Sequence, residues 1–147
     1  MKTTDKNFRY IEWKSPEEMH YSSLQWLSEM EFVQDEHYFF EDMLKEYTLP
    51  IIESQLLSEV KGLIDKLSQS KTKAEKLMKK IREHNNGLDI MVDGKDQPKE
   101  EKEYKIEHRQ LLKEFNVFSR EYQDLKKEVF ETVSKAMKKQ KQKRLLT

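Results

Sequence analysis

The side chains best suited to acid–base or metal chemistry in this sequence are its four histidines. Read at helical spacing, His37, His84 and His108 fall on runs of apolar residues, at places where a leucine would ordinarily pack. An imidazole there can bind a metal ion, exchange a proton near neutral pH, or serve as a neutral polar core residue that fixes helix register. The seam positions favour the third role.

A metal site is the alternative role, and it requires several ligands at one level of a helical bundle. Reflecting the chain about its two predicted turns places His20 level with His108, with Glu17 and Glu107 close by. These four residues are the candidate ligands of a metal or proton-sensing site.

The same reflection puts His37 near Val60, without a histidine companion. Glu36 is expected to pair with Lys61 or Lys126 across the bundle. A carboxylate beside an imidazole can begin an acid–base pair, but the sequence has no cysteine and no phosphate-binding glycine loop or nucleophile motif. We therefore expect neither catalytic activity nor a cofactor.

The three prolines indicate where the helices that carry these residues begin. Ser15 can cap a helix that has Pro16 in its first turn, and Glu18 completes a capping box. Pro50 marks a tight turn or a kink, because it pushes the residue before it out of the helical region. Pro98 precedes acidic residues suited to a first helical turn. The sequence predicts helices at about 16–47, 50–85 and 98–142.

Each predicted helix places an apolar residue alternately three and four positions apart, which is typical of coiled-coil-like packing. Lys66, Lys73 and Lys80 run beside the seam of the second helix, and glutamates recur every seven residues from Glu100 to Glu128 in the third. A short connection makes these helices antiparallel, so the lysines are expected to face the glutamates. The predicted fold is all-α, an up-down-up antiparallel three-helix bundle with coiled-coil-like packing.

The domain organisation follows from these helices. We expect an N-terminal arm at 1–14, the three-helix bundle at 15–133 and a basic C-terminal helical overhang at 134–147. An apolar strip away from the seam of the first helix is the expected interaction surface, and it consists of Phe32, Phe39 and Met43. We expect this phenylalanine strip to be covered either by the aromatic arm or by another protein, which can be a second copy of this chain.

The predicted overhang forms a basic end that could contact an anionic surface. It carries Lys135, Lys138, Lys139, Lys141, Lys143 and Arg144. Cations also favour the C-terminus of a helix on electrostatic grounds, and these lysines are not interleaved with aromatic residues. Over the whole chain 28 basic residues balance 28 acidic residues, so net charge does not favour a nucleic-acid partner.

Composition and motifs together predict a non-enzymatic helical-bundle protein that acts through its surface as an interaction or scaffold module. Its expected partner is another protein or a second copy of itself, and no membrane contact is expected, because no window is as apolar as a membrane span. The absence of cysteine and of a signal-peptide segment favours a cytoplasmic location. Two alternatives remain, a metal- or ligand-binding bundle that uses His20 and His108, and a nucleic-acid-associated protein that uses the basic end.

Overall fold

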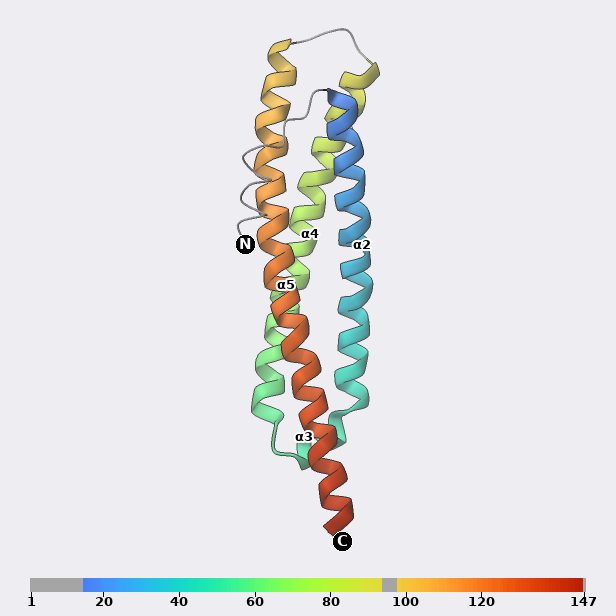
Figure 1. Ribbon diagram of the computed structural model, residues 1–147, viewed down its shortest axis with the longest axis vertical. Helices are drawn as coiled ribbons and strands as arrows, with labels where there is room; N and C mark the ends of the chain where they lie inside the picture. The colour runs from blue at the N-terminus through green and yellow to red at the C-terminus, as the bar shows by residue number, and fades with distance from the viewer. Residues whose placement is uncertain (1–14, 94–97, 147) are drawn as a thin grey trace. The chain divides into compact units, whose positions relative to one another are not determined.

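The computed structural model describes residues 15–93 and 98–146, and every element within these ranges is a helix. The helices are α2 (Pro16–Glu46), α3 (Thr48–Glu53), α4 (Leu57–Asp93) and α5 (Pro98–Leu146), shown in Figure 1. The predicted all-α class is confirmed. The predicted arm at 1–14 lies outside the described residues.

The first helix begins where the sequence predicts. The Glu18 backbone N–H donates a hydrogen bond to Ser15 Oγ at 3.3 Å, which satisfies one of the free donors at the start of α2. Pro16 is the first residue of the helix, where its missing N–H removes no helical hydrogen bond.

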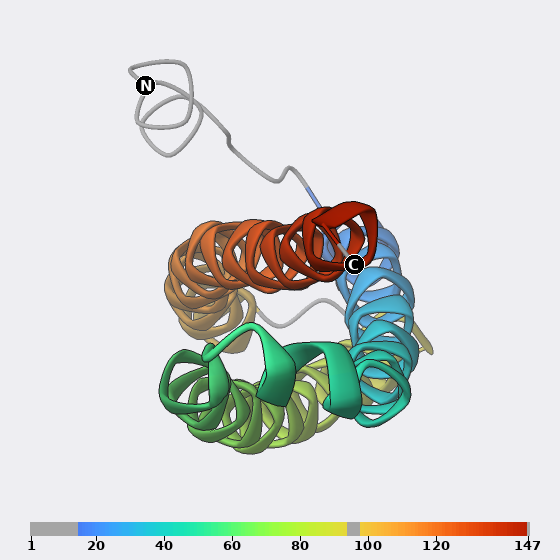
Figure 2. The ribbon, with the colours of Figure 1, turned by 90° about the horizontal axis from the view of Figure 1, so that it is seen from below.

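The predicted second helix at 50–85 is wrong at both ends, because the structure divides its beginning into α3 and α4. Gln55 adopts a left-handed conformation with φ of 61°. Its N–H donates to the Ile52 carbonyl at 3.2 Å, and the Leu56 N–H donates to the Ile51 carbonyl at 3.1 Å. This pair of bonds closes α3 with a Schellman motif and turns the chain before α4 starts. Figure 2 shows α3 between the end of α2 and the start of α4.

Pro50 lies in the first turn of α3, where a helix tolerates proline. At the other end α4 continues past the predicted residue 85 to Asp93. Leu88 explains part of this extension, because its side chain is fully buried and continues the apolar seam. The third predicted helix ends at Leu146 rather than 142.

The chain divides into two compact units. The first unit comprises Met1–Glu31 and Glu75–Phe118, and the second comprises Phe32–Ala74 and Ser119–Thr147. The first unit therefore takes the start of α2, the later part of α4 and the first part of α5, and the second unit takes the remainder together with α3. In the first unit buried Met19 and Leu88 pack with the partly buried Tyr104 and Leu112. In the second unit Tyr122 and Phe40 are the largest fully buried side chains.

Ion pairs join α4 to α5 within each unit, and in the second unit they show the relative direction of the two helices. In the second unit the pairs are Lys66–Glu128 at 3.0 Å and Lys73–Glu121 at 3.8 Å, and in the first unit Lys80–Glu114 at 3.0 Å. The glutamate number falls as the lysine number rises, so the two helices are antiparallel in the second unit. The predicted facing of the lysine and glutamate columns is confirmed.

Candidate functional site

Two of the seam histidines meet in the first unit. His84 of α4 and His108 of α5 are 2% and 0% exposed, and His84 Nε2 lies 2.9 Å from His108 Nδ1. The other ring nitrogen of His84, Nδ1, makes a short hydrogen bond to the Glu107 carboxylate. Trp26 of α2 stacks on the His108 ring with centroids 4.4 Å apart. Carboxylate, imidazole and imidazole thus form one chain from the half-exposed Glu107 side chain into the core.

The surroundings keep this His84–His108 pair neutral. Burial lowers the pKa of His84, while the hydrogen bond and charge of Glu107 act in the opposite direction. Burial, with a smaller contribution from nearby His84, lowers the pKa of His108 to about 3. The simplest arrangement of protons has His84 Nδ1–H donating to Glu107 and His108 Nδ1–H donating to His84 Nε2.

The predicted metal-ligand set is not brought together. His108 faces His84, and Glu107 also binds His84. His20 is half-buried with its Nδ1 atom buried and without a hydrogen-bond partner, and Glu17 is exposed. Among residues 15–93 and 98–146, no group of three or more histidine or acidic side chains is placed to hold a metal ion. The sequence does not predict the His84–His108 contact, because the predicted second helix ends at residue 85, whereas α4 continues to Asp93 and shifts the turn before α5.

His37 occupies the core of the second unit, and its predicted neighbour was wrong. The side chain is fully buried, and His37 Nε2 lies 3.0 Å from Ser70 Oγ. Ser70 is ten positions beyond Val60, the predicted neighbour. Tyr122 meets the imidazole edge-on at 5.2 Å between centroids. Burial is the main cause that lowers the pKa of His37, and the Lys71 charge adds to it.

Glu36 lies beside this histidine and has one of its two predicted partners. Its carboxylate accepts hydrogen bonds from Lys126 Nζ at 2.9 Å and from the Tyr122 hydroxyl at 2.8 Å. Burial, followed by the hydrogen bond and charge of Glu36, raises the pKa of Tyr122. The tyrosine therefore stays a neutral donor. This cluster ties α2 to α5 in the second unit.

The phenylalanine strip is exposed, as the sequence predicts for its two aromatic members. Phe32 and Phe39 are 62% and 56% exposed, whereas Met43 is half-buried. Phe130 of α5, which is 45% exposed, belongs to the same region because buried Phe40 contacts both Phe39 and Phe130. Sequence reasoning missed Phe130, although its position just off the apolar seam of the third predicted helix is the same signal that identified Phe32.

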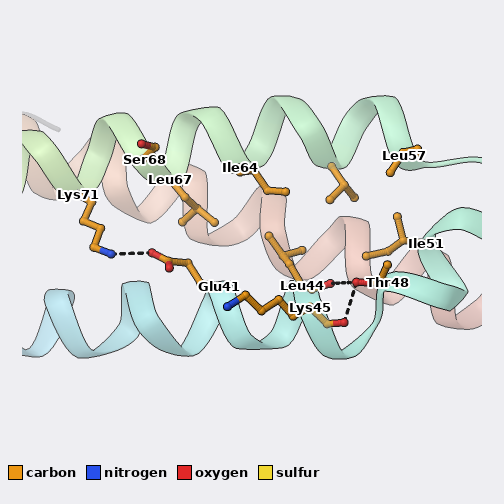
Figure 3. A pocket seen from close by; sticks show the side chains of 11 residues that line it. Glu41, Leu44, Lys45, Thr48, Ile51, Leu57, Ile64, Leu67, Ser68 and Lys71 are labelled. Carbon is orange, nitrogen blue, oxygen red and sulfur yellow. Dashed lines mark hydrogen bonds and ion pairs between the residues drawn. The ribbon is translucent and has the colours of Figure 1, made fainter.

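A second surface feature of this unit is an apolar pocket of about 470 Å³ between α2 and α4 (Figure 3). It is lined by Glu41, Leu44, Lys45, Thr48, Ile51, Leu57, Val60, Ile64, Leu67, Ser68 and Lys71. Sequence reasoning missed it as well. Leu57 and Ile64 gave a signal, because they lie seven residues apart and just beside the seam, and the structure leaves them 42% and 49% exposed.

The basic end lies on α5, and its beginning is not a free overhang. Lys135 is 3.9 Å from the Glu59 carboxylate, and Lys139 donates to the Ser54 carbonyl at 3.3 Å. The chain continues through α3 and turns at Gln55 rather than at Pro50, so Ser54 and Glu59 lie beside the first part of the basic end. Lys138, Lys141, Lys143 and Arg144 are exposed.

Comparison with known proteins does not assign this site. The chain matches no protein-family model and no curated protein, and its structure matches no solved structure. A search of the described helices finds none that combines the length and apolar character needed to cross a membrane.

Proposed function

We propose that this chain is a non-enzymatic interaction or scaffold protein that binds another protein through the phenylalanine strip. The observation that carries this proposal is the exposure of Phe32 and Phe39, at 62% and 56%, on one flank of α2. Burying a phenylalanine completely is worth about 1.5–3 kcal/mol, so two neighbouring rings are strong anchors for a partner. Aromatic side chains, phenylalanine among them, are enriched in protein interfaces relative to the rest of the protein surface.

The neighbourhood of the strip fits an interface. Phe130 extends the aromatic surface from α2 onto α5. The Glu36–Lys126 pair on the same two helices has partly exposed side chains, 19% and 28%, and can act as polar rim. A rigid support under an exposed aromatic patch lowers the entropy lost on binding.

The predicted scaffold belongs to the same proposal. The ion pairs of the second unit join α4 and α5 in antiparallel orientation. This orientation supports an up-down-up three-helix bundle with coiled-coil-like packing. In the second unit Glu36 contacts Lys126 and Phe40 contacts Phe130, so the residue numbers of α2 and α5 rise in the same direction and the two helices run parallel there. The cytoplasmic location expected from the sequence is also part of this proposal.

Catalysis has less support than binding. The imidazoles of the His84–His108 pair are almost completely buried, so a substrate would not reach them without opening the core. The metal-binding alternative loses its main support, because His108 faces His84 rather than a set of ligands. Elemental analysis of the purified protein tests that alternative directly.

The test is capture of partners from the native cell with the intact chain as bait. We expect the Phe32→Glu/Phe39→Glu variant to lose partners that the wild type retains, because each charge would have to be buried in the interface. The matched control is Tyr21→Glu/Leu24→Glu, which changes two apolar residues of the first unit that are 64% and 46% exposed.

Circular dichroism establishes that both variants are folded. The same partners on wild type, strip variant and control would contradict the proposal. Loss of partners by the control alone would place the docking surface in the first unit. Salt-dependent retention on a polyanion column tests the nucleic-acid alternative at the basic end.

A further inference from the structure

The pocket between α2 and α4 has an aliphatic interior. Leu44, Ile51, Val60 and Leu67 are between 1% and 5% exposed and line its walls. In Figure 3 the side chains of Leu44, Ile64 and Leu67 point into the space between the two helices. Its volume of about 470 Å³ lies within the range of about 300–1,000 Å³ that is usual for small-molecule sites.

The pocket is bounded at both ends, which distinguishes it from an open groove for a helix. At one end the Lys71 ammonium of α4 reaches the Glu41 carboxylate of α2 at 3.0 Å. At the other end Ile51 of α3 lies beside Leu57 (Figure 3). The lining from Leu57 to Lys71 follows α4 over about 20 Å, at 1.5 Å per residue. An extended aliphatic chain suits a space of this length that is bounded at both ends better than a folded segment of protein does.

The charged groups are gathered at one end. Lys45, Lys71 and Glu41 are the charged residues that line the pocket, so the lining carries one net positive charge. Lys45 is exposed, and its side chain runs along α2 toward the Glu41–Lys71 end (Figure 3). A ligand with one anionic group at the end of an apolar chain matches both the charge and the aliphatic walls.

We propose that this pocket binds a medium-chain fatty acid, with the alkyl chain against Leu44, Val60 and Leu67 and the carboxylate at the Lys45 end. This site is separate from the phenylalanine strip, so it does not depend on the proposed protein partner. The Glu41 carboxylate repels the ligand head group and holds Lys71, and it therefore limits the affinity of the site.

Titration calorimetry of the intact protein with dodecanoate tests the proposal, at ligand concentrations below self-association. We expect one binding site. Lys45→Gln should weaken dodecanoate binding about two- to fivefold while leaving binding of the neutral dodecanol unchanged, because only the carboxylate meets the ammonium. Lys61→Gln, at an exposed lysine of α4 that does not line the pocket, should change neither.

A substitution of the opposite kind gives an independent test. Glu41→Gln should strengthen dodecanoate binding about two- to fivefold, because it removes a like charge and releases Lys71 from the ion pair. The control is Asp42→Asn at the neighbouring exposed position, which does not line the pocket. A loss of affinity in Glu41→Gln would overturn the assignment of the head group to this end.

Filling the pocket tests its location. Ile64→Trp replaces a half-exposed aliphatic lining residue with a bulkier indole and should lower the affinity for dodecanoate at least about tenfold. The control Ile106→Trp, on the first unit, should leave that affinity unchanged. Circular dichroism confirms that each variant remains folded. The proposal is overturned if dodecanoate does not bind or if Ile64→Trp binds as the wild type does. It is also overturned if Phe32→Glu/Phe39→Glu, rather than Ile64→Trp, abolishes binding.

Discussion

A histidine at a seam position has a defined role in this molecule because a second polar group meets it. His84 Nε2 and His108 Nδ1 share a hydrogen bond at 2.9 Å, and Glu107 orients His84 from the surface. His37 meets the Ser70 hydroxyl in the same manner. A buried imidazole that keeps a hydrogen bond avoids most of the cost of leaving water, but it cannot take up a second proton without a large penalty.

The His84–His108 pair should make stability depend on pH. The pKa of His108 lies at about 3 in the folded chain and near the ordinary histidine value of 6.5 in the unfolded chain. Between these values the unfolded chain binds more protons, so the stability present above pH 6.5 is lost as pH falls toward 3. The free energy of unfolding of the His84→Leu/His108→Leu variant should fall less steeply than that of the wild type between about pH 6.5 and 4, as measured by denaturant titrations at several pH values. Parallel curves for the two proteins would contradict this.

The same substitutions made singly give a sharper comparison. His84→Leu should cost about 1–3 kcal/mol at neutral pH, because it removes the acceptor of the buried His108 Nδ1–H. The double variant should be less destabilised than the sum of the two single variants, since both partners of the hydrogen bond are then apolar. An additive cycle would mean that the two imidazoles are not coupled.

Two glycines on α4 offer a matched pair for testing the packing. A Cβ added to Gly87 would lie 2.0 Å from the Tyr104 hydroxyl and 2.6 Å from its ring carbon Cζ, whereas a Cβ on Gly62 meets nothing within 4 Å. Gly62→Ala should stabilise the protein by about 0.5–1 kcal/mol through helix propensity. Gly87→Ala should destabilise it by about 1–3 kcal/mol, since Tyr104 packs with Met19 and Leu88 and must shift. Thermal unfolding of both variants measures the two changes in stability. Equal stabilisation by the two substitutions would show that Tyr104 moves freely.

At the scale of the elements, helical faces were predictable from the sequence and axial register was not. A seam that repeats every seven residues stays buried when one helix slides by whole heptads, so the pattern alone cannot choose among registers. The connections make that choice. A tight turn at Pro50 would place His37 beside Val60. In the structure α3 and the turn at Gln55 carry the chain further before α4 begins, and His37 lies beside Ser70.

The turn at Gln55 can be tested by itself. A glutamine with φ of 61° is strained, because its Cβ crowds the backbone in the left-handed region. Gln55→Gly should raise stability by up to about 1 kcal/mol, since glycine is the preferred residue at this position of a Schellman motif. Gln55→Val should lower stability by about 1–2 kcal/mol, because a β-branched residue is least compatible with positive φ. Thermal unfolding of the two variants should move in opposite directions, and two shifts of the same sign would contradict the assigned turn.

The charge columns test the register that the turns produce. Reversing Lys66, Lys73 and Lys80 to Glu should destabilise the protein by about 1 kcal/mol, since each exposed pair is worth only a few tenths. Reversing Glu128, Glu121 and Glu114 to Lys in the same molecule should restore most of that loss, because these are the observed partners. Reversing Glu107, Glu114 and Glu121 instead, a set shifted by one heptad from the observed partners, should restore less of the lost stability. High salt should reduce every difference, and simple addition of the two reversals would mean that the columns do not face each other.

At the scale of the whole molecule, the phenylalanine strip links the proposed function to the oligomeric state. The exposed rings of Phe32, Phe39 and Phe130 lie on the second unit, where they form the proposed docking surface. Apolar patches of a few hundred Å² are about the largest that soluble monomers usually expose. The sequence could predict the strip, because off-seam phenylalanines are visible in the helical pattern. It could not predict the partner, because an exposed ring is compatible with many complementary surfaces.

Deletion of residues 1–13 separates the possible coverings, because the arm predicted from the sequence carries Phe8, Tyr10, Ile11 and Trp13. If the arm covers the strip, the intact chain should be monomeric and the truncated chain should associate or bind a hydrophobic dye, since removal of the cover would expose several aromatic rings' worth of apolar surface. Light scattering and dye fluorescence on the intact, truncated and Phe32→Glu/Phe39→Glu proteins measure this. An intact dimer that the double substitution makes monomeric would assign the strip to a second copy instead. An intact monomer that truncation leaves monomeric, dye-free and equally stable would exclude both coverings, and the strip would then be open to a different protein in the resting molecule.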